Sequence, residues 1–188
     1  SASPELFLRR RGRRVRTAPI KGTAPLDRAE TLATSAKDRA ENVMIVDLMR
    51  NDLGRVCAFG TVEVTALADV RPGAGVVHLV SEVEGTLRED ASDADLLRAT
   101  FPPGSVTGAP KVQALKVIAE LESTAREAYT GAIGFASPVA GLELSVVIRT
   151  LEMRSGRIWL GAGGGITFGS EPGAEVEECL VKARPVAA

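Results

Sequence analysis

Segments that alternate apolar and polar residues mostly follow one another in this chain, with helices gathered between groups of them, and this pattern limits the possible folds more than any other feature. Residues 61–67 and 76–84 alternate with the two-residue period of half-buried strands, and Arg71-Pro72-Gly73 separates them as a loop. Further strands are predicted at residues 130–136, 142–151 and 157–160. Successive strands joined by short loops pair in antiparallel fashion. We therefore expect an α+β fold of layered antiparallel β-sheets with flanking helices.

Helical patterns lie between and after these groups of strands. Residues 27–53 contain no Gly or Pro and carry apolar side chains at helical spacing, which predicts one long helix; a strand is the alternative for residues 43–48. Shorter helices are predicted at residues 91–99, 110–122 and 173–184. Pro110 suits the first turn of its helix, because its missing N–H would have no partner there.

Composition excludes several classes of protein. The 188 residues are 45% hydrophobic and 25% charged, with a formal net charge of −1, which allows a sizeable core and does not favour nucleic-acid binding. The basic run Arg9–Arg16 is short, so we expect a solvated face there. No apolar stretch approaches the roughly 20 residues of a membrane helix. Cys57 and Cys179 lack the spacing of a zinc site or disulfide framework, which favours a reducing, cytoplasmic environment.

Carboxylates on two predicted helices are candidates for metal binding. Glu175, Glu178 and Lys182 are spaced by three and four residues, so they project from one face of the last helix. Glu41 lies on the long earlier helix. Carboxylates that converge from two elements can hold Mg²⁺, which takes oxygen ligands. The alternative is an ordinary charged helix face with an internal salt bridge, and the residues alone favour that alternative.

The glycine-rich segment 161–165, between a predicted strand and the last helix, is a candidate anion site. Backbone N–H groups in such a segment can approach a carboxylate or a phosphate closely, although a flexible connection or a bulge is an equally good interpretation. Arg149 is predicted on the strand 142–151, facing away from its apolar residues. If that second face is buried, the guanidinium must pair with an acid, and a protein carboxylate is expected before a substrate one.

Two polar features lie inside predicted elements. His78 is the single histidine and lies mid-strand on the same face as Val80 and Glu82. A structural role is expected for it, while its near-neutral pKa leaves a general-acid or orienting role open. The mixed apolar and charged segment 46–52 indicates a buried ion pair and a helix end.

Seven ordered motifs resemble the chorismate-binding family and together cover nearly the whole chain. They are Ser-Pro-Glu-Leu-Phe at 3–7, Pro-Ile-Lys-Gly-Thr at 19–23, and residues 38–52, 78–81, 104–111, 148–150 and 162–166. The resemblance implies the fold of chorismate-utilising enzymes. Because family members are more than twice as long, it also implies that residues 1–188 are the C-terminal portion of one catalytic domain. We expect weak activity, or none, from this portion in isolation.

The second motif indicates which reaction to expect. Pro-Ile-Lys-Gly-Thr resembles the aminodeoxychorismate synthases, whereas anthranilate synthases usually carry alanine at the position of Lys21. The resemblance implies Mg²⁺-dependent amination of chorismate at C4 to 4-amino-4-deoxychorismate, for p-aminobenzoate and folate synthesis. Ammonia would come from a glutamine amidotransferase subunit or domain. An anthranilate synthase, or a non-catalytic module that binds the amidotransferase, is the alternative.

By resemblance, two residues carry the chemistry. Lys21 would attack the ring of chorismate at C2 as the C4 hydroxyl leaves, and ammonia would then add at C4 while the lysine is expelled. Glu5 would act as general acid for the departing hydroxyl. The alternative for Glu5 is a structural carboxylate paired with Arg9 or Arg10.

The remaining site residues are also assigned by resemblance. Glu41 and Glu178 match Mg²⁺ ligands, Glu175 would act through a water molecule, and His78 matches a position near the reacting ring. Positions that match the substrate pocket are Ser105, Tyr129, Arg149, Gly163, Gly164, Gly165 and Lys182.

Overall fold

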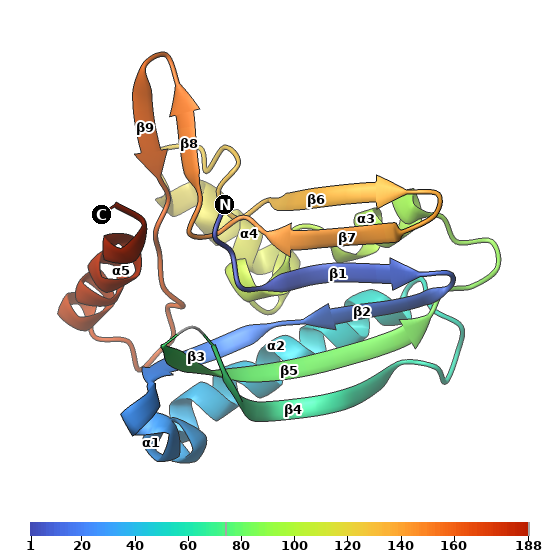
Figure 1. The fold of residues 1–188 in the computed structure, drawn as a ribbon, viewed down its shortest axis with the longest axis horizontal. Coiled ribbons are helices and arrows are strands. Elements are labelled where there is room, and N and C mark those ends of the chain that lie inside the picture. Colours follow the sequence, from blue (N-terminus) through green and yellow to red (C-terminus); the bar gives the residue numbers. More distant parts are fainter. Residues whose placement is uncertain (74, 188) are drawn as a thin grey trace.

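The computed structural model describes residues 1–73 and 75–187, and its main element is a seven-stranded antiparallel sheet (Figure 1). Its strands are β1 (Leu6–Arg11), β2 (Arg14–Ala18), β3 (Ile20–Pro25), β4 (Glu63–Pro72), β5 (Val76–Thr86), β6 (Ala132–Ser137) and β7 (Gly141–Val146). β5 pairs with β4 on one side and with the consecutive strands β2 and β3 on the other, and β1, β7 and β6 continue the sheet beyond β2. The hairpin of β8 (Leu151–Arg154) and β9 (Arg157–Leu160) projects away from it. The predicted α+β class is confirmed.

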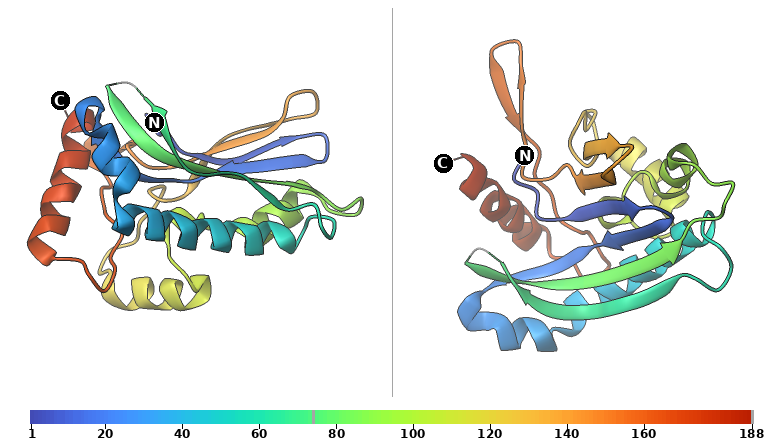
Figure 2. Two further views of the ribbon diagram at one scale, coloured as in Figure 1. Left: turned by 90° about the horizontal axis from the view of Figure 1, so that it is seen from below. Right: turned by 45° about the vertical axis from the view of Figure 1, so that its right-hand side comes forward.

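Helices lie on one face of the sheet and, for the last helix of the chain, beyond one end of the sheet (Figure 2). They are α1 (Ala29–Thr34), α2 (Ala36–Gly54), α3 (Asp93–Thr100), α4 (Lys111–Leu121) and α5 (Pro172–Ala187), with short 3₁₀ turns η1 (Leu26–Arg28) and η2 (Gly104–Val106). α2 runs along the sheet, and its buried Ile45, Met49 and Leu53 pack in one cluster with Phe7 and Val83 of the strands. Burial of such side chains contributes roughly 1.5–3 kcal/mol each, which holds helix and sheet together.

The prediction of one helix over residues 27–53 is wrong, because the helix is interrupted at Ser35, which separates α1 from α2. This residue has extended backbone angles (φ −64°, ψ 107°), and its side chain accepts a hydrogen bond from the backbone N–H of Asp38. The Ser35 hydroxyl pairs with a backbone N–H that would bond to a backbone carbonyl in an uninterrupted helix. Ser35 therefore caps the start of a new helix. The alternative strand over residues 43–48 is also wrong, since these residues lie within α2.

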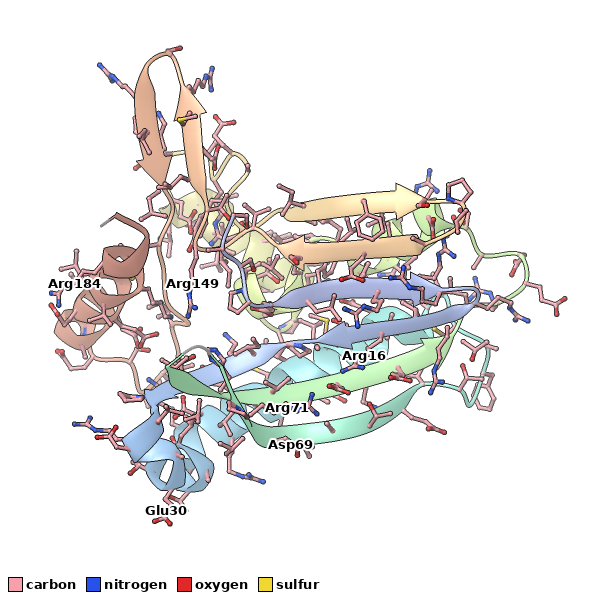
Figure 3. The ribbon with its side chains drawn as sticks, viewed as in Figure 1. Arg16, Glu30, Asp69, Arg71, Arg149 and Arg184 are labelled. Carbon is pink, nitrogen blue, oxygen red and sulfur yellow. The ribbon has the colours of Figure 1, made fainter. Side chains whose placement is uncertain are left out.

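The amino-terminal residues form strands that the sequence pattern did not predict. The run Arg9–Arg16 lies in β1 and β2; residues 11–14 are exposed, which agrees with the expected solvated face, while Val15 is fully buried. Arginine and glutamate side chains of neighbouring strands pair with one another, as Arg9 does with Glu143 at 2.9 Å. Arg16 and Arg71 lie on the face of the sheet opposite α2 (Figure 3). The run of charged residues is therefore part of two strands, in which carboxylates of neighbouring strands neutralise the arginines on one face of the sheet.

The strand predicted over residues 142–151 is wrong in its second half. β7 ends at Val146 and β8 begins at Leu151, and Arg149 between them has a positive φ of 49°. The backbone carbonyl of Arg149 accepts a hydrogen bond from the backbone N–H of Ala2 at 3.0 Å. Arg149 is thus in the connection between the sheet and the hairpin, at the end of the sheet nearest α5 (Figure 3).

A buried ion pair closes the end of α2, as the segment 46–52 predicted. Asp52 is buried, and one of its carboxylate oxygens lies 2.5 Å from the Nζ atom of Lys111 at the start of α4. Lys111 also donates to the backbone carbonyl of Thr100 at 2.8 Å. This pair connects α2, α3 and α4 through charged groups that are both withdrawn from solvent.

The two edges of the sheet differ in their protection. The β4 edge carries charged residues, two irregularities in its register with β5, and Pro72. β6 pairs only with β7 within the described residues and has neither charge nor proline, while Ile133 and Phe135 are exposed. Uncharged exposed edges of this kind promote pairing with another chain.

Replacing Phe135 by Lys is therefore expected to reduce self-association of the chain. A charge on an edge strand opposes strand-to-strand pairing. Light scattering of the purified chain against concentration measures the effect, with Val70→Lys on the protected β4 edge as the matched control. Equal self-association of all three proteins would contradict the prediction.

Candidate active site

Lys21 lies at a bulge in β3, close to the glycine-rich segment. The register with β5 shifts between Ile20 and Thr23, and Gly22 has a φ of 81°. A side chain on Gly22 would also collide with α1, because its Cβ would lie 2.8 Å from Cδ1 of Leu32. Glycine is therefore required beside Lys21 both for its conformation and for the close approach of the helix.

The amine of Lys21 and the carboxylate of Glu41 approach the same glycine. A Cβ added to Gly165 would lie 3.4 Å from Nζ of Lys21 and 3.5 Å from Oε2 of Glu41. Three of the motifs singled out in the sequence, at residues 19–23, 38–52 and 162–166, thus meet at one point. They come from a strand, a helix and a loop that are far apart in the sequence.

Glu5 is buried beside this point and is strongly perturbed. Burial raises its pKa from the ordinary value of 4.5 to about 7, although the hydroxyl of Ser105, the charge of Lys21 and the backbone of Ile20 all act to lower it. A carboxyl with this pKa can hold and release a proton near neutrality.

The alternative pairing of Glu5 with Arg9 or Arg10 is wrong. Arg9 pairs with Glu143, and Arg10 pairs with Asp93 on α3. Because neither arginine is available to it, Glu5 has the Lys21 ammonium as the nearby positive charge that stabilises its ionised form.

The pKa of Glu5 predicts a loss of stability with rising pH. Below about pH 4.5 the carboxyl is protonated in both folded and unfolded states; as the pH rises to about 7 the unfolded state loses the proton first, so folding becomes less favourable. The loss is about 3 kcal/mol, since one pKa unit corresponds to about 1.4 kcal/mol. Urea unfolding at several pH values should show it, and Glu5→Gln should flatten this part of the profile. An unchanged profile in Glu5→Gln would contradict the assignment.

The three candidate metal ligands lie around the same loop. A Cβ added to Gly164 would lie 2.9 Å from Oε2 of Glu175 and 3.7 Å from Oε1 of Glu178. Glu175 is buried, and its Oε2 atom has no hydrogen-bond partner among the described residues. Burial raises the pKa of Glu41; the positive charges of Lys21 and Lys37 lower it, and the carboxylates of Asp38 and Glu178 raise it.

These carboxylates nevertheless do not form a closed ligand cluster. Within residues 1–73 and 75–187, no group of three or more His, Cys, Asp or Glu side chains is close enough to hold a metal ion. Glu178 pairs with Lys182 at 2.5 Å, which is the internal salt bridge that the alternative interpretation predicted. This face of α5 therefore carries an internal salt bridge and also lines the site.

Tyr129 and Lys182 hold the glycine-rich loop. The loop passes so close to the Tyr129 ring that a Cβ on Gly161 would lie 2.3 Å from Cγ and one on Gly163 would lie 2.8 Å from the hydroxyl oxygen. Lys182 donates to the carbonyl of Gly163 at 3.2 Å. Only glycine fits at these two positions, because a side chain would collide with Tyr129, against which the loop packs.

His78 and Arg149 form the polar side of the site. The Nδ1 atom of His78 lies 2.8 Å from the hydroxyl of Thr23, and burial, followed by the charge of Arg149, lowers the pKa of His78. A largely neutral, oriented imidazole follows. Arg149 is partly buried and makes no ion pair with the described residues. The protein carboxylate expected for its guanidinium is thus not found in that part of the chain.

Polar residues that were not predicted as site residues also line the site. Lys37 lies 3.7 Å from Oε1 of Glu175, Ser170 donates to the same oxygen at 2.5 Å, and Thr23 contacts His78. Lys37 precedes Glu41 by one helical turn, so helical spacing could have identified it. Ser170 lies in an irregular loop, where no periodicity marks a functional residue.

The chain belongs to the chorismate binding enzyme family, whose model matches residues 1–188. It is 48% identical over 190 residues to aminodeoxychorismate synthase component 1 of Escherichia coli strain K12. The matched region covers 97% of this chain and 42% of that protein. It is 46% identical to anthranilate synthase component 1 1 of Haloarcula marismortui, over 98% of this chain and 39% of that protein. The chain thus spans less than half the length of these curated relatives.

Solved structures agree with this assignment. Anthranilate synthase component I of Streptococcus pneumoniae TIGR4 superposes with a TM-score of 0.90 at 38% identity, covering 100% of this chain and 43% of that one. MenF, the menaquinone-specific isochorismate synthase of Escherichia coli, superposes with a TM-score of 0.86 at 29% identity, over 98% and 44% of the two chains. None of the described helices combines the length and the apolar character needed to cross a membrane.

Proposed function

We propose that this chain carries the catalytic lysine of an aminodeoxychorismate synthase, which aminates chorismate at C4. The observation that carries the proposal is the position of the Lys21 amine, beside both Gly165 and the buried Glu5. A hydroxyl is a poor leaving group unless an acid protonates it, and Glu5, with a pKa of about 7, can supply that proton when the Lys21 amine attacks. The aminodeoxychorismate synthases among the relatives support the same reaction.

The reaction balances as chorismate and ammonia giving 4-amino-4-deoxychorismate and water. The neutral amine of Lys21 forms a bond from Nζ to C2 of the ring, both conjugated ring double bonds shift, and the C4 hydroxyl leaves as water with a proton from Glu5. Ammonia then forms the new bond at C4 and gives a proton back to the Glu5 carboxylate, the two double bonds shift back, and the bond to Nζ breaks. In a full-length protein, a glutamine amidotransferase subunit or domain would supply the ammonia, and we expect a cytoplasmic location.

The carboxylates of the site fit Mg²⁺ by their chemistry, although no three of them form a closed cluster in the described residues. Glu175 presents a buried oxygen without a partner among the described residues, and the pKa of Glu41 is raised by burial and then by the charges of Asp38 and Glu178, so a cation would stabilise both carboxylates. Glu41 and Glu178 would hold the ion directly and Glu175 through water. When bound, the ion would hold the ring carboxylate of chorismate and offset its charge.

The second carboxylate of chorismate needs a separate cation. Arg149 is suited to it, because this guanidinium is partly buried and has no protein carboxylate partner in the described residues. Tyr129, Ser105, His78 and the backbone amides of residues 163–165 would complete the pocket. Lys182 would add positive charge from α5.

The second candidate function is an anthranilate synthase. The relatives and the structural neighbour that carry this name favour it, while Lys21 argues against it. Incubation of the chain with chorismate, Mg²⁺ and ammonium salt, followed by chromatography, separates the two products, and anthranilate is fluorescent. Aminodeoxychorismate supports the proposal, and anthranilate overturns it. A failure to bind chorismate would instead favour an incomplete catalytic portion or a non-catalytic module that binds the amidotransferase.

A further inference from the structure

The two oxygens of the Glu175 carboxylate have different surroundings. Oε1 accepts a hydrogen bond from the hydroxyl of Ser170 at 2.5 Å and lies 3.7 Å from Nζ of Lys37. Oε2 is buried without a hydrogen-bond partner in the described part of the chain and faces Gly164. A buried carboxylate oxygen without a partner is unfavourable unless something else binds it, so Oε2 is the atom available to a ligand.

The hydroxyl of Ser170 is itself oriented by the loop. It accepts a hydrogen bond from the backbone N–H of Thr167 at 3.0 Å, and the backbone N–H of Ser170 donates to the carbonyl of Thr167 at 3.0 Å. A serine hydroxyl has one hydrogen, and here that hydrogen is used on Glu175. The turn 167–170 thus connects the end of the glycine-rich loop to the carboxylate on α5.

We infer that Ser170 is a positioning residue for Glu175, fixing one oxygen so that the other faces the cation site. This inference rests on the proposed Mg²⁺ site. Outer contacts that orient a ligand raise the affinity of a metal site by reducing the number of side-chain conformations that must be excluded on binding. Lys37 contributes charge at the same oxygen, but its long, half-exposed side chain cannot fix the rotamer as the short serine does.

The test is calorimetric titration of MgCl2 alone into the purified chain and its variants. Ser170→Ala is expected to weaken Mg²⁺ binding by about 10–100-fold, the range found for outer contacts of metal ligands. Ser170→Thr keeps the hydroxyl and should restore most of the affinity. Ser137→Ala is the matched control, because the hydroxyl of Ser137 also accepts backbone N–H groups in a turn, from Val139 at 3.3 Å and Ala140 at 3.1 Å.

The outcomes separate the inference from the proposed function. If the unaltered chain binds no Mg²⁺, the proposed metal site fails and the inference fails with it. If that chain binds Mg²⁺ and Ser170→Ala binds equally well, only the inference is overturned. Thermal unfolding without metal should be the same for Ser170→Ala and Ser137→Ala; a clearly lower midpoint in Ser170→Ala alone, without rescue by Thr, would show a purely structural role and also overturn it.

Discussion

Replacing Lys21 by Ala should abolish a covalent adduct that forms when the chain is incubated with chorismate and Mg²⁺ in the absence of ammonia. Without ammonia, the species attached to Nζ has no nucleophile to displace it, so it should accumulate. Intact mass spectrometry detects the adduct as the mass of chorismate less water. The effect should be all or none, because alanine has no nucleophilic atom.

The control for this experiment is Lys116→Ala, which removes an exposed lysine on α4 and should leave the adduct unchanged. Peptide mapping should place the modification on Lys21. An adduct of equal yield in Lys21→Ala would contradict the covalent role. If neither protein forms an adduct nor binds chorismate, the isolated chain lacks a competent pocket, as we expect if the rest of the relatives' length is needed.

The second large effect concerns stability. Replacing Lys111 by Met should destabilise the chain by about 3–5 kcal/mol, because it leaves the buried Asp52 carboxylate without its cation. Lys111 also bonds the carbonyl of Thr100, so α3 loses a partner as well. Urea unfolding measures the loss. It should be smaller at low pH, because burial raises the pKa of Asp52 and the lone carboxyl can then take up a proton.

A matched surface pair tests whether burial is responsible. Arg50 and Asp47 pair at 3.2 Å on the same helix, but both are exposed. Arg50→Met should cost less than about 1 kcal/mol, as exposed pairs do. The double variant Asp52→Leu with Lys111→Met should recover most of the stability, since a well-packed apolar pair avoids the cost of burying charge. A small effect of Lys111→Met alone would show that water reaches Asp52.

The local pattern predicted the elements in which one signal dominates. β5 (Val76–Thr86) contains the strand predicted over residues 76–84, and α4 begins one residue after the start predicted at Pro110. The buried ion pair was predicted from residues 46–52, since charged residues among apolar ones in a helix need partners. Its partner, Lys111, lies 59 residues further along the chain, and no local pattern identifies it.

Elements whose signal depends on neighbours were mispredicted. The arginine-rich strands β1 and β2 were not predicted, because the glutamates that pair with their arginines, Glu143 and Glu82, lie on other strands. Arg149 continues the alternating pattern of a strand, but in the structure the chain turns there, at positive φ, toward the hairpin. In each case the deciding interaction comes from residues more than 60 positions away or from the direction of the chain.

The antiparallel α+β class and the helices near residues 91–99, 110–122 and 173–184 could be predicted from the sequence pattern, and the ordered motifs indicated the chorismate-binding family. The meeting of Lys21, Glu41 and Gly165, the burial of Glu5, and the Glu175 oxygen that has no partner among the described residues could be found only in the folded chain. Periodicity reports which face of an element is buried, whereas the pKa of a carboxyl and the position of an amine depend on solvent exclusion and on charges contributed by distant segments.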